Sequence, residues 1–327
     1  MNASRRTTTP AHPSRRKVPA PVRTNTVFMG RTDFISTLLR LIGVELYKIR
    51  RRPMASIMLA ISILSVVIVF VIIAISSIVL LHSGDLQAQQ LGGSFSGALR
   101  LPLSLNVTVE IAEFVGMLLM IILAGTIVGG EYTHGTLRLL LTRGPTRTQF
   151  ILMKIGALLV CTFVGFLLTL LIGLIVSLLL NPLTGIPQPL DFLTGAWIMH
   201  AILYALAAML DLFIYAMLAL CLATSGRSTA AGIAGALAWA LLEPVLSNAL
   251  FIIGHISPGP AGRFLSAIPD YLIGNNTGAL LENQGHYLFN STPATLTDLH
   301  ALLVLLVYLA IFIGVAWYVT QQRDITN

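Results

Sequence analysis

Residues 129–154 read GGEYTHGTLRLLLTRGPTRTQFILMK, and this stretch decides the fold. It places charged and polar side chains between two long apolar runs. Apolar runs of about 20 residues are long enough to cross a bilayer as helices. We therefore expect a bundle of membrane-spanning helices, joined here by a polar connection that a partner outside the membrane can reach.

The composition of the whole chain agrees with this interpretation. Of its 327 residues, 56% are hydrophobic and only 10% are charged, and the mean hydropathy is +0.85. Soluble domains carry about 25% charged residues. The net charge of +7 does not predict nucleic-acid binding, because the basic residues cluster beside the ends of the apolar runs. The two cysteines, Cys161 and Cys221, lie inside such runs and show no disulfide or zinc spacing.

Six apolar runs predict an all-α polytopic membrane protein. Polar segments 82–112 and 255–297 separate some of them, and the second of these is rich in Pro and Gly, which predicts irregular structure. Its apolar piece 264–268 is a candidate to dip back into the membrane. The predicted spans are residues 54–81, 113–130, 150–180, 196–224, 229–253 and 298–320.

Small residues in two of these runs predict close helix packing. Gly125 and Gly129 form a small-xxx-small pair in the second span, and Gly232, Ala236 and Ala240 form a similar face in the fifth. Such faces let helix backbones approach closely. The sequence leaves open whether they meet within one bundle or between two copies.

The N-terminal region divides into two parts. Residues 1–32 are rich in Ser, Thr, Pro and Arg, which predicts a disordered basic tail. Residues 33–50 have an amphipathic helical pattern and end at the basic run 50–52 and Pro53, which favours a helix on the membrane surface. The alternative is a plain extension of the first span. The apolar face consists of Ile35, Leu38, Leu39, Ile42, Leu46 and Ile49.

The distribution of lysine and arginine predicts the orientation. With the N-terminus in the cytoplasm and six spans, all but Arg100 and Arg263 of the 20 basic residues lie on the inner side. Cytoplasmic segments of membrane proteins carry this excess of positive charge. We therefore expect both termini, and the connection between the second and third spans, in the cytoplasm.

The connection has features of a short helix joined rigidly to two spans. Residues 136–142 can form two helical turns, and Gly144 with Pro145 ends them. Thr146 then precedes Gln149 by three residues, which is the spacing of a capping box at the start of the third span. Such an element can seat in a groove of a soluble partner. An ordinary basic loop is the alternative.

The same residues resemble the permeases of type 2 ABC exporters. The resemblance rests on Gly130-Glu131, Gly135-Thr136-Leu137-Arg138, Leu140-Leu141, Pro145, Arg147 and Lys154, and more weakly on Glu45-Leu46-Tyr47-Lys48, on Arg50 to Pro53 and on Arg323-Asp324-Ile325. It covers the six-span layout of residues 33–327. It implies a permease subunit that pairs with a second permease copy, or a related permease, and with cytoplasmic ABC ATPase subunits.

The resemblance also implies which residues meet the ATPase. In that family the short helix after the second span is the coupling helix. The residues carried over to this role are Glu131, His134, Gly135, Thr136, Leu137, Arg138, Leu141, Pro145 and Arg147. The chain has no Gly-x-x-x-x-Gly-Lys-Ser/Thr phosphate loop. We therefore expect no enzymatic activity and no cofactor in this chain, and ATP bound by the partner subunit.

Two carboxylates fall inside predicted spans. Asp211 lies near the middle of the fourth, and Glu243 lies toward the outer half of the fifth, before Pro244. Charges at membrane depth are costly and indicate function by default. The first hypothesis is that both line the transport path. The alternative places Asp211 in a hydrogen bond to a neighbouring helix and Glu243 at the outer rim.

Other functions fit less well. The histidines have no metal-ligand spacing, so we expect no metal site. An ion-driven secondary transporter would show inverted repeats and several midplane charges, and a membrane protease would show a nucleophile with a base. Neither pattern is visible, although a scaffold or sensor role stays open. The absence of transit-peptide features favours a bacterial plasma membrane, with lipid around the bundle. The substrate is not determined.

Overall fold

The computed structural model describes residues 31–133, 135, 145–185, 187 and 191–322, and side chains from residue 34 onward. The predicted tail therefore lies outside the described residues, apart from 31 and 32. The described part is helical, without a strand, and contains six helical segments long and apolar enough to cross a membrane. They are Pro53–Leu81, Leu103–Thr133, Arg147–Thr184, Gly195–Gly226, Thr229–Ile256 and Asp298–Gln322.

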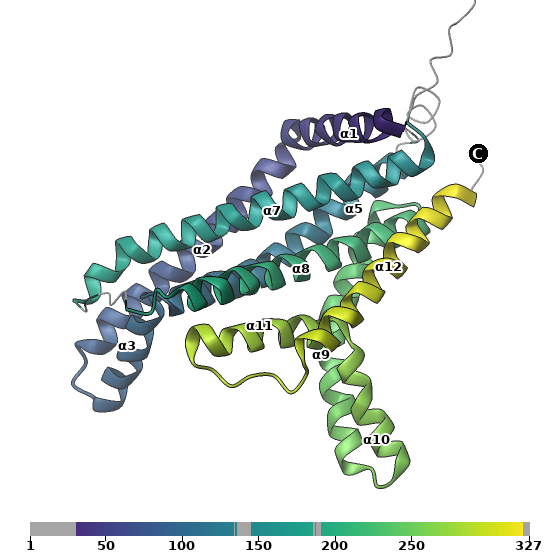
Figure 1. Ribbon diagram of the computed structural model, residues 1–327. Coiled ribbons are helices and arrows are strands. Elements are labelled where there is room, and N and C mark those ends of the chain that lie inside the picture. Colours follow the sequence, from purple (N-terminus) through teal and green to yellow (C-terminus); the bar gives the residue numbers. More distant parts are fainter. Residues whose placement is uncertain (1–30, 134, 136–144, 186, 188–190, 323–327) are drawn as a thin grey trace, which may run out of the picture.

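These six segments confirm the number and order of the predicted apolar helices. Four of them are single α-helices, labelled as in Figure 1: α2 (Pro53–Leu81), α8 (Gly195–Gly226), α9 (Thr229–Ile256) and α12 (Asp298–Gln322). The third segment is α7 (Arg147–Leu180), which continues into the 3-10 turn η2 (Asn181–Thr184). The second segment begins ten residues earlier than predicted. It is composed of α4 (Leu103–Ile111), the π-helix η1 (Ala112–Gly116) and α5 (Met117–Thr133).

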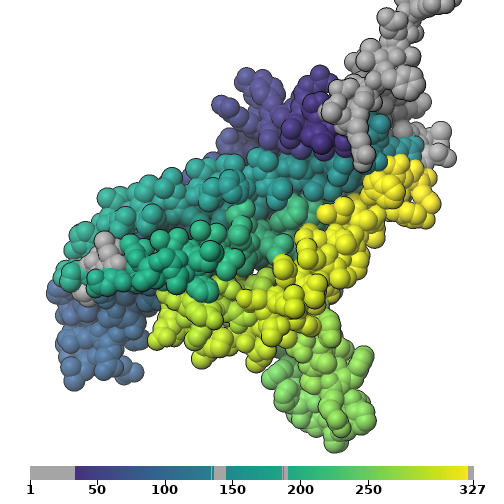
Figure 2. Space-filling view, in the orientation of Figure 1, coloured from purple at the N-terminus to yellow at the C-terminus, as the bar shows by residue number. Residues whose placement is uncertain are grey.

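The segments predicted to be polar connections are largely helical. Residues 82–112 contain α3 (Leu86–Ala98) and α4, and residues 255–297 contain α10 (Pro260–Ala267), η3 (Ile268–Tyr271) and α11 (Ile273–Phe289). The expected irregular structure of 255–297 is thus wrong over most of its length. Helix α10 folds back along the end of α9, where a Cβ atom on Gly262 would lie 1.9 Å from the carbonyl oxygen of Ser257. Figure 2 shows this hairpin projecting from the bundle.

Helix α8 forms the centre of the bundle. Two thirds of its most apolar window is buried (67%), whereas α2, α7, α9 and α12 each bury 22% of theirs. It packs against α5, α9, α11 and α12. Most of the side chains from Tyr204 to Thr224 on α8 are buried. The outer helices instead expose rows of Leu, Ile, Val and Phe, as expected for surfaces that face lipid.

The small-residue faces pack within the bundle. A Cβ atom on Gly129 would lie 2.5 Å from the backbone of Thr229, and one on Gly125 would lie 2.6 Å from Ile233. Gly232, also on α9, approaches Ala223 of α8 equally closely. The glycines therefore allow α5, α8 and α9 to approach within van der Waals contact of backbone. The sequence left open whether these faces pack within one bundle or between two copies, and these contacts lie within one bundle.

Helix α1 (Arg31–Arg51) lies beside the start of α7 (Figure 1). Its Leu38, Leu41 and Ile42 pack against Phe150, Ile151 and Met153 of α7. Helix α1 ends at Arg51, Arg52 precedes α2, and Pro53 occupies the first turn of α2, where its missing N–H has no cost. Ile35 and Leu39, assigned to the apolar face, are each 63% exposed. Part of the apolar face of α1 thus packs on α7, and the other part is exposed.

The end of the bundle that carries α1 also holds the end of α5, the start of α7 and the end of α12. Trp317 of α12 donates its Nε1–H to the hydroxyl of Thr148, 3.2 Å away, and the Nε2 of Gln321 lies 3.0 Å from the same hydroxyl. Helix α3 and helix α10 lie away from this end in Figure 1. The end of α5 and the start of α7 therefore lie at the same end of the bundle as α1 and the end of α12.

Candidate functional site

The third span begins with the predicted capping box. The Thr146 hydroxyl accepts a hydrogen bond from the backbone N–H of Gln149 at 3.2 Å, and the Gln149 side chain accepts from the N–H of Thr146 at 3.0 Å. These two reciprocal bonds satisfy donors that the first turn of a helix leaves free. The start of α7 is thereby fixed two turns before Lys154.

Lys154 lies at the centre of a buried charge cluster. Its side chain is 0% exposed, and its Nζ lies 2.6 Å from an oxygen of Glu45 and 2.6 Å from an oxygen of Glu131. A third bond runs from Nζ to the carbonyl oxygen of Ile127 at 3.3 Å. All three donor positions of the ammonium group are therefore used. The ring of Phe150 lies 5.5 Å from the same nitrogen, which adds a cation–π contact.

A second lysine joins the cluster from its outer side. Lys48 is 38% exposed, and its Nζ lies 3.1 Å from Glu45 and 3.9 Å from Glu131. Burial raises the pKa of the Glu45 carboxyl, but the ammonium groups of Lys154 and Lys48 outweigh this and hold the pKa below its ordinary value. Glu45 is therefore a carboxylate at neutral pH, and two lysines face two glutamates. We call these four residues the Lys154 cluster.

The Lys154 cluster joins three helices at one point. Glu45 comes from α1, Glu131 from the last turn of α5, and Lys154 from the second turn of α7. Removing one member of a buried ion pair leaves an uncompensated charge and typically costs about 3–5 kcal/mol. The three helices are thus joined by ion pairs at the two ends of the α5–α7 connection.

The structure describes part of the predicted coupling element. Glu131, Gly135, Pro145 and Arg147 are described, and only Glu131 of these belongs to the Lys154 cluster. Gly135 has a φ of +65°, and its N–H bonds to the carbonyl of Tyr132 at 3.2 Å, which ends α5 in the usual way for glycine. The other predicted residues lie outside the described ones: His134, Thr136, Leu137, Arg138 and Leu141.

Arg147 connects the start of α7 with the end of α12. Its Nη1 donates to the backbone carbonyls of Thr320 and Gln321. A cation is favoured at these carbonyls because the C-terminal end of a helix carries partial negative charge. Arg147 therefore joins the C-terminal helix to the same end of the bundle as the Lys154 cluster.

The two predicted path residues lie together in another part of the bundle. Glu243 of α9 is 1% exposed and accepts hydrogen bonds from the backbone N–H of Gly274 at 2.6 Å and from the hydroxyl of Tyr215 at 3.0 Å. Glu243 is therefore buried against the segment 255–297. Asp211 of α8 is 7% exposed and is hydrogen-bonded to Thr277 of α11. The second hypothesis for Asp211 predicted such a hydrogen bond to a neighbouring helix.

Helix α11 explains why both carboxylates are accommodated. Its first two turns supply the Gly274 N–H to Glu243 and the Thr277 side chain to Asp211. A helix N-terminus carries partial positive charge and free N–H groups, so it stabilises a nearby carboxylate. Residues 264–268, the candidate to dip back into the membrane, lie in α10 and at the start of η3. The segment that packs beside α8 is α11.

Sequence reasoning missed the cluster as a site. Glu45 and Lys154 appeared in the family resemblance, but nothing related them to each other. The available signal was Lys154 itself, because a lysine inside an apolar span normally has a buried partner. No group of three His, Cys, Asp or Glu side chains suited to a metal ion occurs among the described residues.

Fold and site together define a helical protein with multi-pass membrane character and a buried ionic junction at one end. A family model matches residues 92–326, which is most of the chain, so the protein belongs to the family described as "Protein of unknown function (DUF2705)". A search of curated proteins found no match.

Proposed function

We propose that this chain is the membrane-spanning permease subunit of an ATP-driven ABC exporter. The observation that carries the proposal is the Lys154 cluster, which joins α1, α5 and α7 at the two ends of the α5–α7 connection. A permease driven from outside the membrane needs such a junction. Force applied to a connection reaches the spans only if their ends are held rigidly. The resemblance of residues 130–154 to type 2 exporter permeases supports the same function.

The charge distribution supports one orientation of the chain in the membrane. The end with α1, the α5–α7 connection and the end of α12 carries nearly all the basic residues and faces the cytoplasm of a bacterial cell. Helix α1 lies at the membrane surface, where Ile35 and Leu39 enter the lipid. ATPase subunits then bind the connection, and a second permease subunit completes the transporter.

The proposed mechanism gives Glu131 an indirect role. Its carboxylate is bound to Lys154 inside the bundle, so it transmits the displacement of the connection instead of contacting the ATPase. Closure of the ATPase subunits moves residues 134–146, and the Lys154 cluster passes this movement to α1 and α7. The direct contacts are assigned to the outer residues of the element, of which Arg138 is one.

Co-purification and coupled activity test this proposal. The full chain, extracted from its own cells after cross-linking, is expected to carry a separate polypeptide with a phosphate-loop ATPase motif. In vesicles containing both proteins, the permease is expected to stimulate ATP hydrolysis. Arg138→Ala is expected to abolish the stimulation while the chain stays folded. Arg263→Ala, a basic residue at the opposite end, is the matched control.

Two results would contradict the proposal. One is a chain that never associates with an ATPase in cross-linked membranes. The other is an associated ATPase whose activity is the same with the wild-type chain, with Arg138→Ala and with no permease.

An ion-driven transporter is the second candidate, because of one specific observation. Asp211, Glu243 and the N-terminus of α11 meet inside the bundle, and ion-coupled transporters place half-helix termini and carboxylates at such depth. Glu113, in the π-helix of the second span, also interacts electrostatically with Asp211. Uptake or efflux that follows an ion gradient and ignores ATP depletion would favour this candidate.

A further inference from the structure

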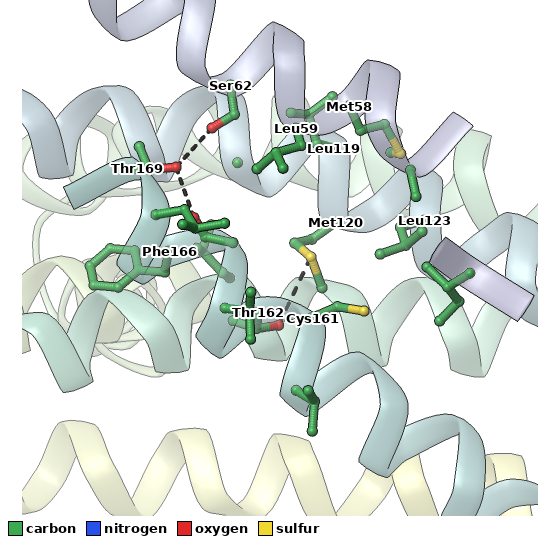
Figure 3. A pocket seen from close by; sticks show the side chains of 18 of the residues that line it. Met58, Leu59, Ser62, Leu119, Met120, Leu123, Cys161, Thr162, Phe166 and Thr169 are labelled. Atoms are coloured by element: carbon green, nitrogen blue, oxygen red, sulfur yellow. Dashed lines mark hydrogen bonds between the residues drawn. The ribbon is translucent and has the colours of Figure 1, made fainter. Parts of the chain in front are cut away.

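A cavity of about 400 Å³ lies between α2, α5 and α7, apart from the Asp211 and Glu243 sites. Figure 3 shows Met58 and Leu59 facing Met120 and Leu123 across it, with Phe166 and Thr169 along one side. The volume is in the range of small-molecule sites. The outer surfaces of α2 and α7 expose long rows of aliphatic side chains, so lipid surrounds this part of the molecule.

The lining of the cavity demands an apolar occupant. Three of its four hydroxyl groups already bond within the protein: Ser62 and Thr169 to each other at 2.9 Å, and Thr162 to the carbonyl of Leu158 at 3.0 Å. The fourth belongs to Ser56, which is exposed. Most of the remaining lining is Leu, Met, Ile, Ala and Phe. A polar ligand would lose its hydration here without gaining partners.

The charged lining residue is Arg50. It stands in the last turn of α1, is exposed, and makes no ion pair or hydrogen bond with the described residues. Arg51 and Arg52 follow it, although neither lines the cavity, and Arg51 donates to the hydroxyl of Tyr47. One cationic group thus stands at an apolar cavity, at the chain position where α1 meets the first span. Basic residues at such positions attract anionic lipid headgroups.

We propose that this cavity holds one acyl chain of an anionic phospholipid, with the phosphate beside the guanidinium of Arg50. The acyl chain fills the space between α2, α5 and α7, and the headgroup supplies the anion that Arg50 lacks among the described residues. The site thereby secures α1 to the bundle from the lipid side, next to the Lys154 cluster. The assignment does not depend on the proposed transport function.

Gly165 allows the cavity to be filled by mutation. It lines the cavity, and no atom lies within 4 Å of a Cβ placed on it. A side chain can therefore start from Gly165 without a clash at its Cβ, and Gly165→Phe is expected to occupy the acyl-chain space. Gly314→Phe is the matched control, because Gly314 of α12 also has open space around its Cβ but lies outside the cavity. Arg50→Gln removes the headgroup contact, and Arg51→Gln is its control.

Native mass spectrometry of the full chain provides the test. The protein is equilibrated in detergent micelles with equal amounts of phosphatidylglycerol and phosphatidylcholine. Wild-type protein is expected to retain phosphatidylglycerol preferentially. Arg50→Gln is expected to weaken its binding about tenfold, as for the loss of a charge-assisted hydrogen bond. Gly165→Phe is expected to remove binding, and both control variants are expected to bind as wild type. Size-exclusion profiles check that each variant is folded.

Specific outcomes would overturn the assignment. Equal retention of the two phospholipids, or unchanged retention in a folded Gly165→Phe variant, would exclude an anionic lipid in this cavity. Oleic acid in a separate sample distinguishes the lipid source. If oleic acid binds in an Arg50-dependent manner and phosphatidylglycerol does not, the occupant is a free fatty acid and the phospholipid assignment is wrong.

Discussion

The ammonium group of Lys154 lies 2.6 Å from the carboxylate of Glu45, although 109 positions separate the two residues in the sequence. This contact joins α1 to the start of α7, and Glu131 adds the end of α5. Residues far apart in the sequence therefore hold three helix ends together.

Lys154→Met is expected to destabilise the protein by about 3–5 kcal/mol, because it leaves Glu45 and Glu131 buried without their shared cation. Replacing Glu45, Glu131 and Lys154 together by Met is expected to restore most of that loss, since no buried charge then lacks a partner. Thermal unfolding in detergent measures both effects. Lys48→Met, at the exposed side of the cluster, is the control and is expected to change stability by about 1 kcal/mol or less.

Low pH is expected to remove the stabilising contribution of Glu45. Its pKa is lowered in the folded protein from the ordinary value of 4.5, so its contribution is fully present above pH 4.5 and is lost as the pH falls through the lowered pKa. The stability difference between wild type and Glu45→Gln should therefore be largest at neutral pH and shrink below pH 4.5. Unfolding temperatures of both proteins across this range give the comparison. A gap that widens on acidification would contradict the lowered pKa.

Gly129→Ala is expected to force α5 away from α9, because the added Cβ would lie 2.5 Å from the backbone of Thr229. Overpacking of this kind costs about 1–3 kcal/mol. The neighbouring Gly130 is a matched control, since no atom lies within 4 Å of a Cβ placed on it. Gly130→Ala should be neutral or stabilising by up to about 1 kcal/mol, as for any open helical glycine. Equal effects of the two substitutions on the unfolding temperature would show that the close approach is absent.

Asp211→Asn tests whether the buried carboxylates serve transport. The substitution keeps the size of the side chain and its ability to bond to Thr277, but removes the charge. If Asp211 lines the path, transport should fall while the folded fraction stays unchanged. Glu110→Gln is the control, because Glu110 is exposed and bonds to Asn106 on its own helix. Transport equal to wild type in a folded Asp211→Asn variant would assign the residue to helix packing alone.

Local patterns in the sequence predicted the helices well. The six apolar runs appear as six helices, the Thr146–Gln149 spacing appears as a capping box, and Gly125 and Gly129 lie at a close helix contact. Each of these signals depends on residues within one helix or one turn. The helices in segments 82–112 and 255–297 were missed because their polar side chains and prolines hide the apolar faces that pack on α2, α8 and α9.

The sequence by itself determined which segments are membrane-length helices and where the basic side of the chain lies, because hydropathy and charge are read residue by residue. Only the tertiary structure decided that Glu45, Glu131 and Lys154 meet, that Glu243 is buried against α11, and that a cavity separates α2 from α5. These features depend on the packing of distant helices. A charged residue within an apolar run indicates that a partner is needed, but only the packing of the helices shows which residue is that partner.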